Sequence, residues 1–440
     1  MASQAAPIAG VVERVGRYRW SIIALLFFAT TVNYIDRTML GLLAPMLGKE
    51  LGWNENDYGN IVTAFQAAYA LGFLLMGWLV DRFGPKIGYA IAISIWTVGH
   101  VAHGFASSVV AFMAARVVLG VGEAGHFPSV VRASSEWFPQ KERAYAIGWV
   151  NSATTIGVIL TAPTLWIFMT WQGFGWRETF FYTGLFGAAL LALWLWWYSN
   201  PREKRGQVSD GELAWIEHDP PETTAPLPWR RVVRKREAWA FASAKFLTDP
   251  VWFLMLFWLP SYFASTYEVD LKVVLLPMIA MYLLADVGSI AGGWLSSRLI
   301  HNGHTPNVAR KVTMLISGCC VLPLLFVTSI DNMWLAVALI GLALAGHQSF
   351  SSNLLSLPPD MFPKRAVGSV IGLGGFAGGI GGMIMAKSTG LVLDATGGNY
   401  TIIFAVCTTT YFIAVAVIHL LSPRLAPVTS EGKAGSQPAI

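Results

Sequence analysis

Long apolar stretches alternate with short polar ones along almost the whole chain. Each stretch is close to twenty residues long, the length that a helix needs to cross the hydrocarbon core of a bilayer. The pattern predicts twelve membrane-spanning helices. They cover residues 20–46, 57–80, 86–106, 109–131, 143–169, 179–198, 238–263, 273–297, 311–330, 333–357, 365–388 and 399–421.

Composition supports a multi-pass membrane protein. Of the 440 residues, 55% are hydrophobic and only 12% are charged, whereas soluble domains carry about 25% charged residues. The first apolar stretch contains a charged pair and lacks a cleavage site, so we expect a retained helix rather than a signal peptide. The three cysteines lie in apolar stretches, and we expect neither a disulfide nor a metal site: Cys319, Cys320 and Cys407.

Basic residues predict the orientation in the membrane. Twenty-three of the 30 Lys and Arg residues fall on the side that carries both ends of the chain, and three fall on the other side. Because basic loops stay in the cytoplasm, both termini are predicted to be cytoplasmic, in a cell inner membrane. The net charge of +5 is therefore no indication of a nucleic-acid partner.

An internal repeat divides the chain into two halves. Residues 77–82 recur as 293–298, and residues 138–148 recur without a gap as 362–372. Two six-helix halves in the same orientation are typical of secondary transporters, which bind their substrate between the halves. The predicted organisation is an N-terminal half, a cytoplasmic linker, a C-terminal half and a disordered tail, at 1–198, 199–237, 238–425 and 426–440.

The linker is the one long polar connection. Ser209 followed by Glu212 resembles a capping box and predicts a short surface helix over 210–218, before the Pro-rich residues 219–228. Five basic residues follow within 230–236. We interpret them as an anchor to anionic lipid, with a partner-binding site as the alternative.

The loop between the second and third predicted spans carries a specific motif. It reads Gly77-x-Leu79-x-Asp81-Arg82-x-Gly84-Pro85-Lys86. This resembles the signature loop of the major facilitator superfamily, and the resemblance covers essentially the whole chain. It implies an all-α membrane protein of twelve transmembrane helices in two pseudo-symmetric six-helix bundles. The repeat departs from the motif at Ser297, where an acidic residue is expected, so the two halves should form unequal gates.

Three further stretches narrow the resemblance. Residues 33–37, 116–124 and 246–252 are similar to the anion:cation symporter branch, in particular to its hexuronate and aldonate transporters. This implies proton-coupled uptake of a sugar-acid anion such as galacturonate, glucuronate or galactonate. The coupling ion is H⁺, and no other cofactor is expected.

Asp36 and Arg37 interrupt the first span with two opposite charges. Charges at membrane depth are costly and usually functional, and adjacent helical residues point about 100° apart, so each needs its own partner. An arginine suits a carboxylate substrate because its fork binds two oxygens. We expect Arg37 to bind the substrate and Asp36 to couple protons or gate; the alternative is a structural ion-pair network.

Arg116 and Glu123 lie two turns apart on the fourth span, about 10 Å from each other. They are too far apart for a direct bond, and a partner from the first span, Asp36 or Arg37, fits between them. We expect a relay in which Glu123 and Asp36 take up protons while Arg116 holds whichever carboxylate is ionised. A permanent buried salt bridge is the alternative. In the second half, Lys245 is expected to offer a second cationic contact to the anion, unless Asp249, four residues later, neutralises it.

Neutral polar residues complete the predicted substrate site. Tyr69 and Gln66 share a face of the second span, and a polar cluster interrupts the tenth. Any one member of that cluster can instead join helices to one another, and His347 or His126 is an alternative proton carrier. The predicted neutral contacts are Tyr34, Gln66, Tyr69, His347, Gln348, Ser351 and Asn353.

The loop motif also predicts a gate. We expect Asp81 to accept hydrogen bonds from backbone donors or from Arg143, which would latch the cytoplasmic side; alternatively the motif only holds a tight turn. Arg82 and its repeat counterpart Arg298 belong to the same predicted gate.

The sequence thus predicts a proton-coupled importer of a sugar acid, acting as a monomer in the lipid bilayer. Another organic anion, such as glucarate or an aromatic carboxylate, or coupling to sodium remains an alternative. An enzyme lacks support, since no metal-spaced cluster and no nucleophile with an evident base occurs. A nutrient sensor on a transporter fold would need an output domain larger than the linker.

Overall fold

The computed structural model describes residues 16–428 except 54, 205, 220–228 and 268–270. The described part is helical and contains no β-strand, as the sequence predicts. The first half comprises α1 (Tyr18–Leu51), α2 (Glu55–Phe105), α3 (Val109–Glu123), α4 (His126–Trp137), α5 (Gln140–Leu165) with a π-helical end (Trp166–Trp171), and α6 (Trp176–Trp197). The second half comprises α9 (Arg236–Tyr267), α10 (Leu271–His301), α11 (Pro306–Val321) with a 3-10 end (Leu322–Ser329), α12 (Met333–Met361), α13 (Lys364–Thr396) and α14 (Thr401–Leu421).

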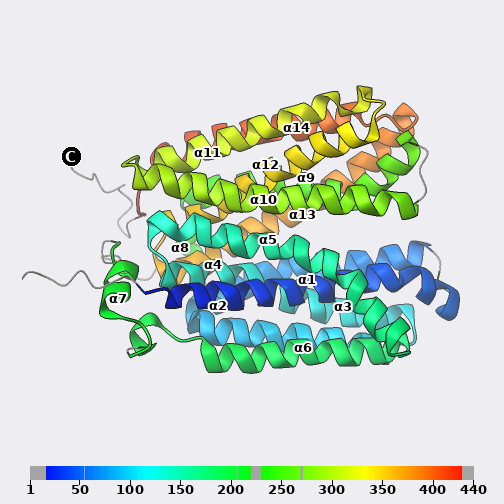
Figure 1. Cartoon of the computed structure of the whole chain (residues 1–440), viewed down its shortest axis with the longest axis horizontal. Helices are drawn as coiled ribbons and strands as arrows, with labels where there is room; N and C mark the ends of the chain where they lie inside the picture. Colours follow the sequence, from blue (N-terminus) through cyan, green and yellow to red (C-terminus); the bar gives the residue numbers. More distant parts are fainter. Residues whose placement is uncertain (1–15, 54, 205, 220–228, 268–270, 429–440) are drawn as a thin grey trace, which may run out of the picture.

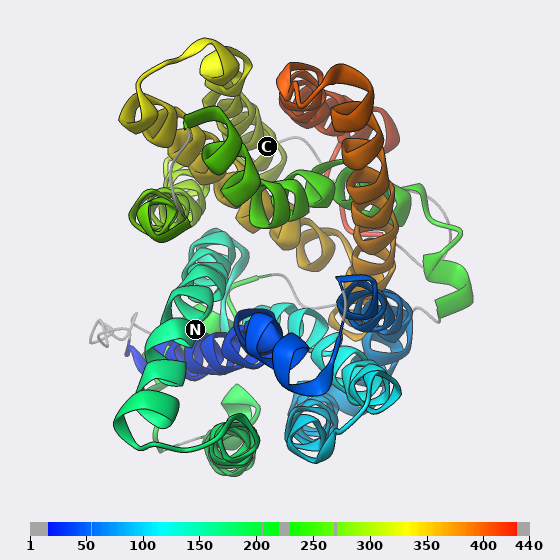
Figure 2. The same ribbon diagram turned by 90° about the vertical axis from the view of Figure 1, so that its right-hand side faces the viewer.

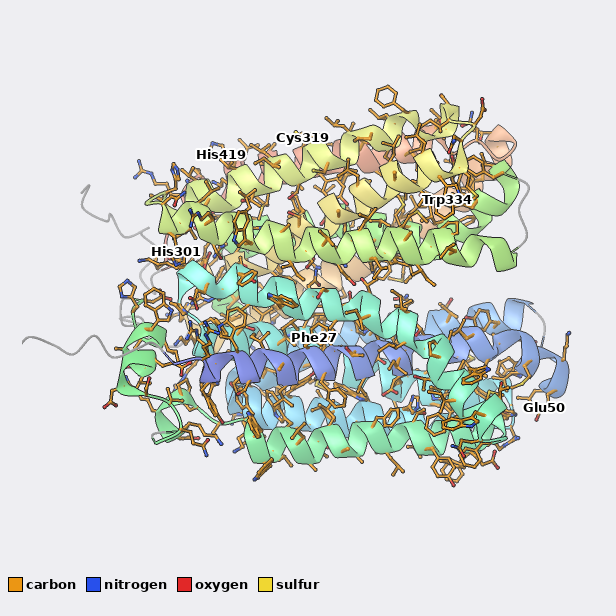
Figure 3. The ribbon with its side chains drawn as sticks, in the orientation of Figure 1. Phe27, Glu50, His301, Cys319, Trp334 and His419 are labelled. Atoms are coloured by element: carbon orange, nitrogen blue, oxygen red, sulfur yellow. The ribbon has the colours of Figure 1, made fainter. Side chains whose placement is uncertain are left out.

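The helices run side by side along the long axis and form two bundles. Figures 1 and 2 agree that α1–α6 make one bundle and α9–α14 the other. Two apolar core clusters lie in the first bundle, and a third fills the second bundle and includes Val131 and Ile147 of the first. We call the end that carries α7 (Asp210–Ile216) the linker end. In Figure 3, His301 and His419 lie toward this end, and Glu50 and Trp334 lie toward the other, which we call the far end.

All twelve predicted spans are helical, although their connections differ from the prediction. The second and third form one element, α2, whose only break is Gly84 at φ 76°. Glycine adopts this left-handed conformation without steric cost, so the signature loop is a sharp bend rather than an irregular loop. The fourth span divides into α3 and α4 at Ala124–Gly125.

Within the described residues, nine helices are long and apolar enough to cross a membrane by length and composition. One of them, residues 60–105, contains two of the predicted spans. Large apolar side chains such as Leu71, Val98 and Leu185 are exposed on the outside of the bundle. Exposed apolar helix faces of this extent suit a lipid environment, so the protein is a multi-pass membrane protein.

The two bundles meet along two seams, one between α2 and α13 and one between α5 and α10. Small residues line both seams. A Cβ on Gly77 would collide with the backbone oxygen of Gly368, and a Cβ on Gly293 would collide with that of Ala144. Glycine at these positions lets the helix backbones approach closely, as at other helix interfaces in membranes.

The linker packs on the first bundle. Ser209 caps α7 by accepting from the backbone N–H of Glu212 at 3.2 Å, so the predicted short helix is confirmed. The predicted capping box is only half formed, because the buried Glu212 accepts from the backbone N–H groups of Tyr18 and Arg19 instead. A short helix, α8 (Trp229–Val232), lies within the basic run. The predicted Pro-rich segment, from residue 220 on, and the tail from 429 lie outside the described residues.

Candidate functional site

The strongest charge contact of the first bundle joins α1 to α3. Arg37 Nε donates to Glu123 Oε2 at 2.6 Å. The side chain of Glu123 is fully buried, whereas that of Arg37 is 15% exposed. Arg37 is therefore the accessible member of the pair. Its Nη2 also reaches Asn33 Oδ1 at 3.4 Å, one turn earlier on the same helix.

Aromatic rings enclose the Arg37 guanidinium. Its carbon lies 4.5 Å from the ring centre of Tyr69, 4.7 Å from that of Tyr34 and 5.6 Å from that of Phe65. Such contacts stabilise a cation while leaving its N–H groups available to an anion. Two predicted site residues, Tyr34 and Tyr69, are thus brought to Arg37. Gln66 lies one turn from Tyr69 on α2 and is half-buried.

Arg116 takes a different place from the one predicted. It forms no ion pair among the described residues, and its Nη1 donates to the backbone oxygen of Arg37 at 3.1 Å. In this structure Arg116 therefore pairs with neither of the two carboxylates that it was expected to hold, Glu123 or Asp36. Of the two candidates from the first span, α1 turns Arg37, and not Asp36, toward the carboxylate of α3.

Asp36 faces away from this pair, toward the interior of the first bundle. Its Oδ1 lies 3.3 Å from Nδ1 of His100 on α2, and both side chains are buried. The sequence interpretation overlooked His100. A signal was available, because two histidines three residues apart, His100 and His103, interrupt an apolar span, and intramembrane ionisable residues are seldom idle.

The second bundle carries its charges within one helix. Lys245 Nζ lies 2.7 Å from Asp249 Oδ1, four residues later on α9. The alternative of local neutralisation thus describes this structure. Gly378 of α13 packs against the Asp249 carboxylate so closely that a Cβ there would collide with it. α13 therefore supports the pair from the side.

The polar cluster of α12 is engaged mainly with other helices. His347 Nδ1 lies 2.7 Å from the hydroxyl of Tyr411, and its ring stacks on Trp252 at 5.4 Å. Gln348 accepts from Asn151 of α5 at 2.8 Å, across the boundary between the bundles. Asn353 donates to the backbone oxygen of Gly292 at 3.1 Å.

The structure also places two other predicted residues, Ser351 and His126. Ser351 is half-buried on α12. His126, an alternative proton carrier, lies between the hydroxyls of Thr30 and Tyr89 at 3.0 and 2.6 Å. Both of its ring nitrogens are therefore occupied, which fits a role in holding helices together.

Asp81 joins the bundles at the linker end. Its two carboxylate oxygens accept from the backbone N–H groups of Gly368 and Ser369, at 2.7 and 2.6 Å. Both donors lie near the start of α13, where the helix dipole favours a negative charge. The expectation of backbone donors is met, and Arg143 is not the partner. Arg82 lies beside the rings of Trp78 and Phe83.

Arg143 makes a separate contact between the bundles. Its Nη1 lies 2.8 Å from Asp360 on α12, and its Nη2 lies 3.1 Å from Asp219 of the linker. Arg310 of α11 shares the same Asp360 at 3.0 Å. The fourth predicted gate residue, Arg298, is exposed in the last turn of α10.

A buried carboxylate at the second seam also escaped the sequence interpretation. Asp286 of α10 faces Thr155 of α5 across the boundary between the bundles. Neither of its oxygens has an ideal hydrogen bond among the described residues. The position places an acidic group midway along the seam.

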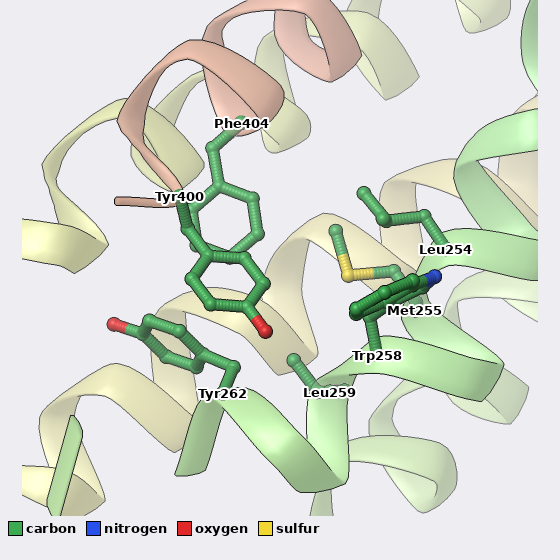
Figure 4. Close-up of a pocket in the computed structure, with 7 residues that line it drawn as sticks. All are labelled: Leu254, Met255, Trp258, Leu259, Tyr262, Tyr400 and Phe404. Carbon is green, nitrogen blue, oxygen red and sulfur yellow. The ribbon is translucent and has the colours of Figure 1, made fainter. Parts of the chain in front are cut away.

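One apolar pocket lies apart from these charges. It lies between α9 and α14 (Figure 4) and is too narrow to hold even a water-sized sphere. Its lining has no charged residue, which does not suit an anion. It is formed by Leu254, Met255, Trp258, Leu259, Tyr262, Tyr400 and Phe404.

Comparisons with known proteins agree with this architecture. The family model of the Major Facilitator Superfamily matches residues 5–386. Among solved structures, a proton:xylose symporter of that superfamily superposes with a TM-score of 0.69 at 15% identity, over 92% of this chain and 94% of the other. At this identity the likeness concerns the fold alone.

Two curated relatives are similar in sequence over nearly their whole length. The Hexuronate transporter of Escherichia coli (strain K12) is 29% identical over 397 residues, covering 88% of this chain and 90% of the relative. The D-galactonate transporter of Escherichia coli O6:H1 is 28% identical over 422 residues, covering 92% and 95%.

Proposed function

The chain belongs to the major facilitator superfamily, and from this premise we propose that it imports a sugar-acid anion together with protons by alternating access. As a transporter of this superfamily it is not an enzyme. The named relatives carry hexuronate and D-galactonate, and the proposal places this chain among transporters of such polyhydroxy carboxylates. It acts in the cytoplasmic membrane, with both ends of the chain in the cytoplasm.

The observation that carries the proposal is the setting of Arg37. Its guanidinium is partly exposed, enclosed by aromatic rings and held by one buried carboxylate, that of Glu123. A substrate carboxylate that reaches Arg37 competes with Glu123 for the same N–H groups. The planar fork of arginine suits such an exchange because it binds either carboxylate in a similar geometry.

This competition couples the substrate to a proton. While Glu123 is ionised, it neutralises Arg37, so an anion gains little there. Once Glu123 accepts a proton, Arg37 is left as an uncompensated and largely buried cation, which is costly until an anion arrives. Protonation and substrate binding therefore favour each other, as the reciprocity of linked equilibria requires.

The two bundles move relative to each other at the seams. Contacts at the linker end hold the bundles together through Asp81 and through Arg143 with Asp360. Opening toward the cytoplasm breaks these contacts. Lys245 and the polar residues of α12 belong to the second bundle, so a substrate that touches both bundles favours their closure around it.

The test is uptake by the purified protein in proteoliposomes. Labelled galacturonate, glucuronate, galactonate and glucarate are offered under an imposed proton gradient, an imposed sodium gradient or neither. We expect at least one sugar acid to accumulate under the proton gradient, and neither protein-free liposomes nor the Arg37→Gln variant to accumulate it. Accumulation under the sodium gradient alone would contradict proton coupling. No uptake of any of the four would contradict the substrate class.

A further inference from the structure

Asp36 is a buried charged residue of the first bundle that the Arg37 site does not use. It lies one position before Arg37 on α1, yet its carboxylate is buried on another face of the helix. Within the described part of the chain, its closest charged or titratable neighbour is His100 of α2, whose Nδ1 lies 3.3 Å from Asp36 Oδ1. Neither carboxylate oxygen of Asp36 nor Nδ1 of His100 has a hydrogen-bond partner among the described residues, so these two buried groups have only each other within reach.

The other ring nitrogen of His100 contacts a third helix. Nε2 lies 2.8 Å from the hydroxyl of Thr183 on α6. That hydroxyl also lies 2.7 Å from the backbone oxygen of Thr179, to which it donates. Three helices of one bundle thus meet in a row of polar atoms, from the Asp36 carboxylate to the Thr179 carbonyl, in which neighbours lie 2.7 to 3.3 Å apart.

Counting hydrogens along this row constrains the proton content. A threonine hydroxyl has one hydrogen. When Thr183 donates it to Thr179, the hydroxyl can only accept from His100, and Nε2 must then carry a hydrogen. Nδ1 and the facing oxygen of Asp36 would be two bare acceptors unless a second proton lies between them, on either atom.

The alternative arrangement holds one proton fewer. Thr183 turns to donate to Nε2, Nδ1 keeps the remaining hydrogen and donates it to Asp36, and the carboxylate is ionised. One proton leaves, and the unit changes from neutral to a net charge of −1. A neutral unit is favoured in an apolar interior because an isolated buried charge is costly.

We infer that Asp36, His100 and Thr183 form a proton-binding unit inside the first bundle, in which the Thr183 hydroxyl reverses its hydrogen bond when the proton is lost. The inference rests on the proposed function and deepens it. It adds His100 as a proton-sharing partner of Asp36 and Thr183 as a positioning residue.

The charges around the unit link it to the substrate site. The negative charge of Glu123 on α3 acts on Asp36. The positive charge of Arg116, on the same helix, acts on His100. His103 faces His100 from one turn along α2, but its Nδ1 donates to its own helix at Gly99. The ring of Phe180 on α6 packs on both histidines, at 5.2 Å from each.

A substrate anion at Arg37 replaces the negative charge that Glu123 loses when it accepts a proton. A nearby negative charge favours the protonated, neutral state of the unit over the ionised state. Binding of the anion therefore strengthens proton binding at Asp36 and His100, and proton binding strengthens binding of the anion to the same extent.

The test is nitrogen NMR on the purified full-length protein with ¹⁵N-labelled histidine, without any substrate. The signals of His100 are identified as those missing from His100→Gln. We expect Nε2 of His100 to carry a hydrogen at low pH and to lose it at high pH, while Nδ1 is the protonated nitrogen at high pH. An unchanged His100 over the whole pH range in which the protein stays folded would overturn the inference.

Variants separate the unit from a merely structural contact. Thr183→Val removes the hydroxyl at nearly equal volume and should shift the midpoint of the His100 transition, whereas Thr183→Ser should restore it. His103→Gln is the matched control and should leave the transition in place. A transition that is insensitive to both Asp36→Asn and Thr183→Val would also overturn the inference.

The outcome is independent of the substrate. If none of the four sugar acids is taken up but the His100 transition is found, the proposed substrate class fails and the proton-binding unit stands. If uptake is proton-driven and His100 does not titrate, the unit fails and the proposed function stands.

Discussion

The two bundles repeat one topology but arrange their charges differently. In the first, Arg37 on α1 contacts Glu123 on α3, and the two residues are 86 positions apart in the sequence. In the second, Lys245 meets Asp249 four residues later on α9. The first pair depends on how two helices are rotated against each other, whereas the second needs only one helix.

This difference assigns different tasks to the two pairs. A pair within one helix keeps its geometry whenever that helix stays folded. A pair between helices is sensitive to any change in their packing and to any competitor for one partner. We therefore expect the first bundle to carry the coupling of proton to substrate, and the second bundle to contribute affinity.

The largest effect is expected from removing the Arg37 charge. Arg37→Gln leaves Glu123 buried without its partner, which typically costs about 3–5 kcal/mol when a buried pair is broken, and it removes the proposed anion contact. Uptake should fall by at least ~100-fold. Arg37→Lys keeps the charge but loses the planar guanidinium that binds two carboxylate oxygens. It should therefore recover only a small part of the native uptake rate. Initial uptake rates at equal amounts of reconstituted protein measure the effect.

Glu123→Gln tests whether the pair between helices couples the proton. Glutamine resembles a protonated glutamate in shape and charge, so the variant should exchange bound substrate in counterflow at a rate near that of the native protein. It should fail to accumulate substrate against a gradient. Accumulation that persists in this variant would show that Glu123 is not the coupling group.

Lys245→Met tests the pair within one helix. The proposed second cationic contact is lost, and we expect the apparent affinity for the sugar acid to fall by about tenfold, roughly 1.4 kcal/mol, with coupling retained. The double variant Lys245→Met, Asp249→Asn removes the carboxylate that the single change leaves unpaired. Equal affinity in the native protein and the double variant would assign Lys245 a purely local role.

The smallest effect is expected at the unequal gate. Asp81→Asn keeps one acceptor oxygen of two for Gly368 and Ser369, so it should weaken the linker-end contact and favour opening on that side. Ser297→Asp adds the acidic residue that the repeat lacks and should favour closure there. Labelling of single introduced cysteines from either side, in a background without native cysteines, measures the shift. Unchanged accessibility in Asp81→Asn would rule out a latch.

The sequence was informative about features that depend on interactions between residues close to one another in the chain. The bilayer imposes a span length on apolar stretches, and so the twelve spans were predictable. The contact of Lys245 with Asp249 was foreseen as an alternative because helical spacing alone brings them together. The preference of Asp81 for backbone donors was likewise foreseen, although no pattern indicated which helix supplies them.

The remaining site depended on rotation between helices, which no periodicity specifies. The sequence interpretation placed a partner from the first span, Asp36 or Arg37, between Arg116 and Glu123, but only the packing of α1 against α3 shows that Arg37 is the residue that meets Glu123. His100 and Asp286 were overlooked because neither has a partner within its own span that would have indicated its role. Their significance lies in what they face, Asp36 and Thr155, and those partners come from other helices.

The contacts that hold the linker on the first bundle limit how far the two bundles can move apart during transport. Glu212 holds the start of α1, and Asp219 accepts from Gln140 and pairs with Arg143 at the start of α5. The linker as far as Asp219 therefore travels with the first bundle as one body. Trp229 packs against the core cluster of the second bundle. The covalent chain from Asp219 to Trp229 can span at most about 35 Å, so the rocking motion cannot separate these two residues by more than that distance.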